Sequence, residues 1–320
     1  MAVTLRDVAD RAGVSRSAVS RTFTQGASVS ASMRARVMDA AEALGYRPSA
    51  IAASLSTGRS KLIGLVATNF NNPVLLEVFE RYTRALQERG LRPLLVNLRD
   101  DADPAEAIAM LQGYLVDGVI IASSTVSPDF AAAFGAAGIP TVHSFGPTGD
   151  APRVHVVGID NVEAGRIAGR AVRASGQAPG MLAGPRGASS TRDRVAGFLE
   201  ICPGAPVIYA DAYAFEAGRA AMAANVEAAT AWFCGDDMLA MGALSALRDA
   251  GRRVPDDAGV VGFNDMDIAG WEGIDLTTVR MPVGDIIAGA VELVTAPAER
   301  PPEVRLHRLQ LVERGTLRRG

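Results

Sequence analysis

The segment Thr4–Phe23 reads TLRDVADRAGVSRSAVSRTF and predicts two short helices joined by a tight turn. Its first residue is a good N-cap, and Asp7, three positions later, completes an imperfect capping box. Small and apolar residues then recur at helical spacing as far as Gly13, which can adopt the left-handed conformation that ends many helices. Ser15 can cap a second helix, which we expect over 16–23. Two helices about such a glycine turn are typical of the helix-turn-helix, whose second helix enters the major groove of DNA.

A third helix and a polar outer face complete this N-terminal module. The third helix is expected over 32–44, with Gly45 at its end. The apolar residues of the second helix face inward. Its outward residues are Arg16, Ser17, Ser20 and Arg21. Arginine can pair with a guanine edge through two hydrogen bonds, and serine can bond bases or phosphates, so this face is expected to contact DNA.

Charge is unevenly distributed along the chain. The 320 residues carry a net charge of −3. Residues 1–61 hold nine basic and four acidic residues, a net charge of +5, which leaves −8 for the remainder. A basic head on an acidic body indicates that the head meets a polyanion and the body does not.

Length and composition indicate the class of protein. A chain of 320 residues is too long for one ordinary core and predicts two or three compact units. A hydrophobic content of 48% with 5% aromatic residues fits an alanine-rich α/β protein. Cys202 and Cys234 lack metal-type spacing and indicate neither a zinc site nor a disulfide framework. The first 13 residues contain no apolar run of signal-peptide length, and 118–123 is too short to span a bilayer, so a cytoplasmic protein is expected.

After Lys61 the pattern changes to apolar strands that alternate with helices. Helices are expected between the strands, for example Val74–Arg89 and Pro104–Tyr114, and 295–303 reads as a surface loop. The expected strands are 62–67, 93–97, 118–122, 139–143, 154–159, 180–183, 206–210, 230–234 and 259–263. Strands separated by helices predict parallel sheets, and their number favours two doubly wound lobes with a cleft between them.

Enzyme motifs are missing from the sequence. It contains no phosphate-binding P-loop, no nucleophile elbow and no HExxH zinc motif. Its histidines, His143, His155 and His307, are scattered, and the first two fall in or beside expected strands, where a structural role is favoured. We therefore expect no catalytic residues, no metal and no cofactor.

Two stretches, TLRDVADRAGVSRSAVSR at 4–21 and VSASMRARVMDAAEALGYRPSAIAASL at 29–55, resemble the lactose-repressor (LacI) family of bacterial transcription regulators. The resemblance extends over nearly the whole chain. It implies an all-α helix-turn-helix headpiece over 1–47, a hinge helix and linker over 48–61, and an effector-binding and dimerisation core over 62–320.

The resemblance also implies the architecture of the core. The family's core has the periplasmic-binding-protein type I fold, which consists of two doubly wound parallel-sheet lobes. The expected N-lobe comprises about 62–159 and 282–310. The expected C-lobe comprises about 160–281 and the C-terminal end.

DNA contacts follow from the same resemblance. In the family, the positions of Arg16, Ser17 and Arg21 read bases, and contacts are further expected at Thr4, Ser15 and Ser20. An alternative in which Ser20 or Arg21 meets only phosphate remains open.

The linker carries two further DNA-binding predictions, at Ala52 and Leu55. The family's hinge helices form only when paired with the dimer mate on DNA. A leucine at the position of Leu55 then wedges into a minor-groove step, which bends the duplex. The alternative is a passive tether, with Leu55 packed on the core.

Small molecules bind open α/β sheets beyond the carboxyl ends of the strands, so the loops after the strands are the place to seek an effector site. Matching the family's motifs there assigns an arginine fork, a carboxylate, amides and an aromatic face, which together suit the hydroxyls and the apolar face of a sugar. The arginine, Arg194, is expected at a solvent-filled cleft mouth, outside the core. The assigned residues are Asn72, Val74, Leu75, Phe145, Ser190, Arg194, Tyr213, Phe215, Asp236 and Asn264.

Two departures from the family pattern affect the expected ligand. Phe145 stands where many relatives carry an acid, and Asp236 stands where relatives usually have asparagine. These changes move a carboxylate across the cleft and make one wall more apolar. The effector can therefore be a deoxy sugar, a pentose, a sugar acid or another small metabolite.

These features together predict an effector-responsive, sequence-specific DNA-binding transcription regulator, in particular a repressor that binds a pseudo-palindromic operator as a homodimer. The C-terminus has no leucine heptad, which favours a dimer over a tetramer. The alternative is a solute-binding protein of the same core fold without DNA-binding activity. An enzyme on the same two-lobe scaffold is a third, weaker alternative.

Overall fold

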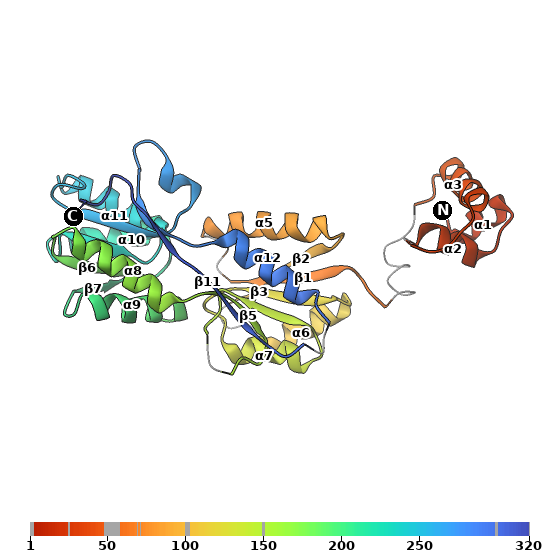
Figure 1. The fold of residues 1–320 in the computed structure, drawn as a ribbon, viewed down its shortest axis with the longest axis horizontal. Coiled ribbons are helices and arrows are strands. Elements are labelled where there is room, and N and C mark those ends of the chain that lie inside the picture. Colours follow the sequence, from red (N-terminus) through yellow and green to blue (C-terminus); the bar gives the residue numbers. More distant parts are fainter. Residues whose placement is uncertain are drawn as a thin grey trace. The chain divides into compact units, whose positions relative to one another are not determined.

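The structure is a computed structural model that divides into two compact units, Met1–Ser60 and Lys61–Gly320 (Figure 1). We refer to them as the headpiece unit and the core unit. The residues that it describes are 3–24, 26–47, 58–68, 70, 72–99, 103–148, 151–297 and 300–319.

The headpiece unit consists of three helices, α1 (Leu5–Ala12), α2 (Arg16–Phe23) and α3 (Ala31–Leu44). The expected capping box between Thr4 and Asp7 is present, and Gly13 ends α1 with a φ of 63°. The third helix begins one residue earlier than expected, because the side chain of Ser30 accepts a hydrogen bond from the Met33 amide and so caps it. A small core joins the three helices. It comprises Val8, Ala9, Val19, Val37, Ala40 and Ala41.

The first sheet of the core unit belongs to the N-lobe and is parallel throughout, in the order β11-β5-β4-β3-β1-β2. Its strands are β1 (Leu62–Ala67), β2 (Arg92–Asn97), β3 (Gly118–Ala122), β4 (Thr141–Ser144), β5 (His155–Ile159) and β11 (Val304–His307). Helices α5 and α12 cover one face, and α6 and α7 cover the other. These helices are α5 (Val74–Glu88), α6 (Pro104–Gly113), α7 (Pro128–Ala136) and α12 (Val283–Val294).

The second sheet belongs to the C-lobe and has the order β12-β10-β9-β8-β6-β7, with only β12 antiparallel to its neighbour. Its strands are β6 (Pro179–Ala183), β7 (Val207–Tyr209), β8 (Ala231–Cys234), β9 (Gly259–Asn264), β10 (Thr277–Arg280) and β12 (Gln310–Val312). Helices α8 and α9 cover one face, and α10 and α11 cover the other. The helical segments are α8 (Asn161–Ala174), α9 (Ser189–Ile201), α10 (Phe215–Ala223), α11 (Asp237–Asp249) and the short 3₁₀ helix η1 (Asp267–Gly270).

The chain passes between the lobes three times, between β5 and α8, between β10 and α12, and between β11 and β12 (Figure 1). Residues at the carboxyl ends of strands from both lobes, among them Thr68, Ser123, Asp236 and Asn264, line one cleft. A doubly wound fold places a ligand at these strand ends.

Helices α8 and α9 approach each other at glycines. A Cβ atom on Gly165 would lie 2.1 Å from the Arg194 carbonyl oxygen, and one on Gly197 would lie 1.8 Å from the Val162 carbonyl oxygen. Neither distance is compatible with a side chain, so the two backbones are in direct contact. This contact fixes the position of α9, which carries Arg194.

Both tryptophans of the chain lie in the C-lobe. Trp232 in β8 is completely buried, with its ring close to Gly180. Trp271 follows η1, and 60% of its surface is exposed.

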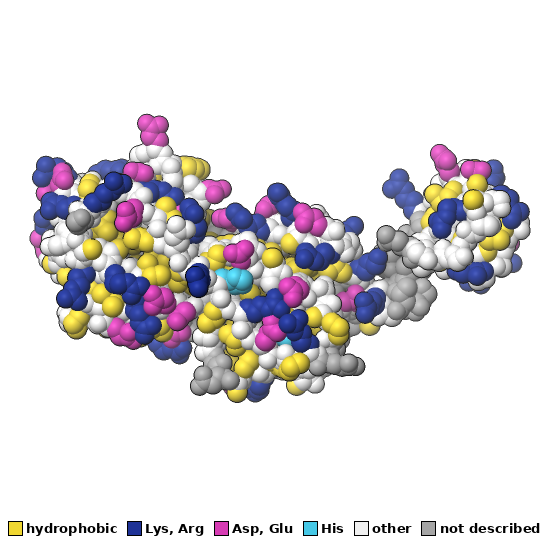
Figure 2. All heavy atoms as spheres, viewed as in Figure 1, with side chains coloured by type: hydrophobic (Ala, Val, Ile, Leu, Met, Phe, Trp, Pro, Cys, Tyr) yellow, Lys and Arg dark blue, Asp and Glu magenta, His cyan; other side chains and the backbone are white. Residues whose placement is uncertain are grey.

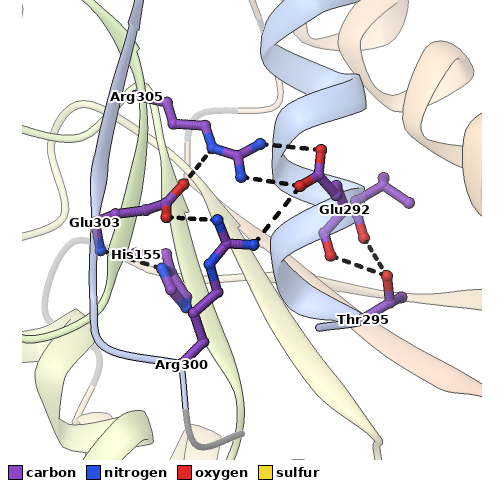
Figure 3. A network of polar contacts seen from close by, with 7 residues as sticks. His155, Glu292, Thr295, Arg300, Glu303 and Arg305 are labelled. Atoms are coloured by element: carbon purple, nitrogen blue, oxygen red, sulfur yellow. Dashed lines mark hydrogen bonds and ion pairs between the residues drawn. The ribbon is translucent and has the colours of Figure 1, made fainter. Parts of the chain in front are cut away.

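A network of charged side chains joins the edge strand β11 to α12 (Figure 3). Arg305 donates to both carboxylate oxygens of Glu292 at 2.9 and 3.0 Å and also pairs with Glu303. Arg300 reaches the other oxygen of Glu303 at 2.8 Å. The backbone amide of Glu303 donates to Nδ1 of His155 in β5. Single surface ion pairs contribute little, but this network brings the segment after α12 back to the sheet.

All nine expected strands are present, with bounds that shift by at most two residues. Strands β10, β11 and β12 were not predicted. They are three or four residues long and contain polar residues, so they lack the apolar runs that revealed the others.

Candidate functional site

The exposed face of α2 is the candidate DNA-binding surface. Ala18, Val19 and Thr22 of this helix are buried against the other helices. The four predicted DNA-contacting residues of the helix are exposed on its opposite side, and they are Arg16, Ser17, Ser20 and Arg21. Arginine side chains are visible over this unit in Figure 2. The helix therefore presents two guanidinium groups and two hydroxyls to solvent from a rigid backbone.

Capping interactions fix the ends of α2. Ser15 accepts from the Ala18 amide at 3.2 Å, and its hydroxyl lies 2.9 Å from that of Ser17. At the other end, Nη1 of Arg34 donates to the Thr22 carbonyl at 2.9 Å. Arg34 therefore braces the carboxyl end of α2.

Thr4 is exposed and caps α1, so its hydroxyl already bonds Asp7. Ala52 and Leu55 lie outside the described residues, so their predicted DNA contacts remain predictions.

A cavity of about 130 Å³ lies in the cleft between the lobes. A water molecule needs roughly 10–15 Å³ by the same measure, so the space corresponds to roughly ten waters. Of the ten predicted effector residues, only Phe215, the first residue of α10, is absent from the lining of this cavity. The nine that line it are Asn72, Val74, Leu75, Phe145, Ser190, Arg194, Tyr213, Asp236 and Asn264.

Arg194 is buried in this site, which corrects the expectation of a solvent-filled cleft mouth. Only 7% of the residue is exposed, and its guanidinium carbon lies 3.5 Å from the centre of the Phe263 ring. Nε donates to Oδ1 of Asn161 at 2.9 Å, and Nη1 donates to the Gly235 carbonyl at 2.6 Å. Burial lowers its pKa, and nearby acidic groups, Asp236 among them, oppose the shift. Among the described residues Nη2 has no hydrogen-bond partner, so it is the part of the fork that a ligand can use.

Asp236 links the two lobes. It caps α11 by accepting from the Leu239 amide at 2.8 Å, and its second oxygen accepts from Nδ2 of Asn72 at 3.1 Å. Burial raises its pKa to about 6, and these hydrogen bonds together with Arg194 oppose the rise. The carboxyl group is therefore mostly ionised at neutral pH.

Asp237, the next residue, does not line the cavity. It accepts from the Thr278 hydroxyl at 2.6 Å and from the Met266 amide at 2.8 Å, both within the C-lobe. Burial raises its pKa to about 7. This carboxylate holds the loop that follows Asn264, the last residue of β9.

Two cavity residues adopt backbone conformations that are rare for side chains other than glycine. Phe145 has a φ of 62° and Asn264 a φ of 121°. Such conformations persist only where surrounding contacts enforce them, and they concentrate at ligand sites. After Asn264, the side chain of Asp265 lies between Arg280 at 2.5 Å and Arg314 at 2.7 Å. These ion pairs hold the turn that directs Asn264 to the cavity.

Tyr213 presents its hydroxyl to the start of α9. The hydroxyl lies 2.6 Å from that of Thr191 and 3.3 Å from that of Ser190. Its ring packs over Gly184, where a Cβ atom would lie 2.3 Å away. The ring is therefore held in place where it lines the cavity.

Half of the residues that line the cavity were not predicted from the sequence. The missed polar residues follow directly after predicted strands, and they are Thr68, Ser123, Ser124, Thr125 and Asn161. The rule that ligands bind beyond strand ends, applied to every strand, would have found them. The missed apolar residues are Val78, Ala122, Ile159 and Met281.

His143 supports the loop that carries these hydroxyls. Its Nε2 lies 2.8 Å from the Ser123 carbonyl, and burial lowers the pKa of the ring to about 4. The imidazole is therefore neutral and donates to that carbonyl. This is the structural role expected of His143.

Neither a metal-binding cluster nor a membrane-spanning helix is found in the described part of the chain. No group of three histidine, cysteine or acidic residues there is arranged to hold a metal ion. None of the described helices combines the length and apolarity needed to cross a membrane.

Comparison with known proteins agrees with this two-part construction. The family of bacterial regulatory proteins named after lacI matches residues 4–49, and the periplasmic binding protein-like domain matches 173–317. The HTH-type transcriptional repressor PurR of Proteus mirabilis (strain HI4320) is 33% identical over 293 residues, which cover 87% of this chain and 85% of that protein. The chain belongs to the lacI family of bacterial regulatory proteins. PurR of Yersinia pestis (strain Pestoides F) is 31% identical and covers 99% of this chain and 97% of its own length.

Solved structures of lacI-family proteins share the fold. The lac repressor dimer bound to operator and the anti-inducer ONPF superimposes with a TM-score of 0.88 at 24% identity, over 99% of both chains. A complex of the regulator CelR with cellobiose gives a TM-score of 0.71 at 27% identity, over 98% of this chain and 99% of that one. As a lacI-family member, the chain is a DNA-binding transcriptional regulator with an effector-binding domain, and it is not an enzyme.

Proposed function

We propose that this chain represses transcription as a homodimer on a pseudo-palindromic operator, and that a small neutral sugar bound in the cleft controls its DNA affinity. Its place of action is the cytoplasm, where the DNA lies. The observation that carries the proposal is that one chain combines an exposed basic recognition helix with a cavity lined by both polar and apolar side chains.

On the DNA side, Arg16 and Arg21 are proposed to read base edges, with Ser17 and Ser20 on bases or phosphates. Thr4 and Ser15 are proposed as phosphate contacts at helix starts. Ala52 and Leu55 are proposed to form the minor-groove wedge at the hinge. Similarity to PurR, an HTH-type transcriptional repressor, supports repression over activation.

On the effector side, the cavity combines the two kinds of surface that a sugar needs. Its apolar lining comes mainly from the N-lobe, with Val74, Leu75, Phe145 and Ile159. Hydroxyls and amides also line it, and among the described residues Nη2 of Arg194 and the side-chain amide of Asn264 have no hydrogen-bond partner. A sugar ring offers one face of C–H groups and a rim of hydroxyls, which such a cavity can bind at once.

Charge favours a neutral ligand over a sugar acid. Among the described lining residues, the one arginine, Arg194, is offset by the one carboxylate, Asp236. A ligand carboxylate would be attracted by Nη2 of Arg194 and repelled by the carboxylate of Asp236. The size of the cavity suits a monosaccharide.

The DNA half of the proposal is tested by selection from a random-sequence duplex pool with the purified full-length protein. We expect enrichment of a pseudo-palindrome, and light scattering should give the mass of a dimer. Enrichment of no sequence above the starting pool would overturn sequence-specific repression.

The effector half is tested by a thermal-shift screen of pentoses, hexoses, deoxyhexoses and the matching sugar acids. Each ligand that raises the melting temperature is then added to the complex with selected DNA, and DNA affinity is measured by fluorescence anisotropy. We expect a neutral sugar to bind and to change DNA affinity. A sugar acid as the sole ligand would contradict the charge argument, and binding without any change in DNA affinity would contradict control by the cleft.

A further inference from the structure

Three helices begin at the cleft, and their N-terminal caps meet there. Asn72, the residue before the N-cap Pro73, accepts from the Val74 amide at 3.1 Å with Oδ1 and in this way caps α5 of the N-lobe. Asp236 caps α11 of the C-lobe through the Leu239 amide. The caps bond each other, because Nδ2 of Asn72 donates to Oδ2 of Asp236 at 3.1 Å.

The third helix, α9, receives its cap from the opposite lobe. Its own N-cap residue, Ala188, supplies no side-chain hydrogen bond. Instead the carbonyl of Ser124, in the N-lobe, accepts from the Ser189 amide at 3.3 Å and from the Ser189 hydroxyl at 2.9 Å. The Ser190 hydroxyl lies 3.2 Å from that of Ser124. Separation of the lobes would leave these helix-end groups without protein partners.

We propose that the bonded caps Asn72 and Asp236 form a latch that holds the lobes closed, assisted by Ser124, and that this latch sets how readily the cleft accepts its effector. This latch would regulate the site described above, and it rests on the proposed function only in that the cavity is taken as the effector site. A ligand that requires closed lobes binds with an apparent affinity proportional to the closed fraction. The latch therefore tunes effector sensitivity through residues that need not touch the effector.

The direction of the central bond is fixed by the chemistry of the two caps. Oδ1 of Asn72 is already used by the Val74 amide, so the amide group cannot turn without breaking the cap of α5. Position 72 must then donate across the cleft, and position 236 must accept. An asparagine at 236 would keep the cap of α11 with its oxygen and would point an N–H donor at another donor. Both residues are at least nine-tenths buried, so water cannot readily replace the bond.

The reciprocal exchange tests this directly. Asp236→Asn opposes two donors, and Asn72→Asp opposes two carboxylates, so each single variant should lose the latch. In the double variant Asn72→Asp/Asp236→Asn, the new carboxylate at 72 caps α5 and accepts from the new amide at 236, which still caps α11. The hydrogen bond across the cleft is thereby restored, with position 236 as the donor and position 72 as the acceptor.

Lobe separation is measured by electron–electron double resonance between spin labels on Glu106→Cys in α6 and Glu216→Cys in α10. Both positions are exposed, and the native cysteines are buried, so labelling is selective. The labelled full-length chain is mixed with excess unlabelled chain, so that distances within one chain dominate. A charged hydrogen bond of this kind should change the closed-to-open ratio by about tenfold or more.

Asp237→Asn is the matched control, because the hydrogen bonds of this neighbouring buried carboxylate to described residues all lie within the C-lobe. We expect longer distances in both single latch variants, and the original distribution in the double variant and in Asp237→Asn. The proposal is overturned if Asp236→Asn leaves the distribution unchanged, if the double variant stays as open as the single variants, or if Asp237→Asn opens the lobes equally. The measurement uses neither DNA nor effector, so failure of the repressor proposal would appear in the selection experiment and not here.

Discussion

Replacement of Arg194 by alanine is expected to destabilise the core unit by about 3 kcal/mol. The substitution removes two hydrogen bonds made by a buried guanidinium, to Asn161 and to the Gly235 carbonyl, each worth about 1.5–3 kcal/mol. It also removes the stacking on Phe263, worth up to about 2 kcal/mol when desolvated. Relief from burying a charge offsets part of this loss, which gives the smaller net figure.

Thermal unfolding of the full-length protein, followed by circular dichroism, measures this effect. A loss of about 3 kcal/mol in a unit of this size corresponds to a fall in Tm of about 6–12 °C. Arg192→Ala is the matched control, two residues earlier on the same helix. The Arg192 side chain is 69% exposed and, among the described residues, pairs with Asp193 alone, so its removal should change stability by less than about 1 kcal/mol. Equal melting temperatures for the two variants would show that the buried contacts of Arg194 contribute nothing, and the reasoning would be refuted.

Three further predictions concern other parts of the chain. Arg16→Ala and Arg21→Ala should each weaken binding to the selected operator by about 1–3 kcal/mol and affect random DNA much less, and equal losses on both DNAs in anisotropy titrations would mean phosphate contacts only. Asp237 has a pKa raised by burial to about 7, so the folded state holds its proton more tightly than the unfolded chain, and the associated stability is lost as pH rises through that value. Wild-type stability to urea should therefore fall by about 2–3 kcal/mol more than that of Asp237→Asn between about pH 5 and about pH 8, and parallel pH profiles would contradict this. Gly197→Ala would place a Cβ atom 1.8 Å from a carbonyl oxygen of α8, whereas the Cβ atom of the control Gly187→Ala meets nothing within 4 Å. Gly197→Ala should therefore lower Tm far more than the control, and equal melting temperatures would contradict this.

Local signals in the sequence were enough to predict the headpiece and most of the two sheets. The caps Thr4 and Ser15 and the turn at Gly13 act within four residues, so a linear pattern contains all that is needed. The longer apolar strands could also be predicted, because each is a continuous apolar run in the sequence. The last strands, β10 to β12, are held in place by partners far along the chain, such as the network around Arg305, and a short polar segment does not reveal such partners.

For the candidate site, residue identity was predicted better than residue environment. Nine of the ten predicted effector residues line the cavity, because the loops after strands converge there. The burial of Arg194 could not be read from the sequence, since it depends on Phe263 and on the backbone at Gly235. Likewise the bond between Asn72 and Asp236 joins residues 164 positions apart. Such contacts arise only when the two lobes are assembled.

The placement of the two tryptophans makes the protein's intrinsic fluorescence a report on one lobe. Trp232 is sealed in the C-lobe core and should emit at short wavelength, whereas Trp271 is 60% exposed and should emit at longer wavelength and be accessible to iodide. Neither the headpiece nor the N-lobe contains an indole group. An unfolding curve recorded by tryptophan emission would therefore miss an earlier loss of either of these parts, and a tryptophan introduced into the N-lobe would make the two lobes separately observable.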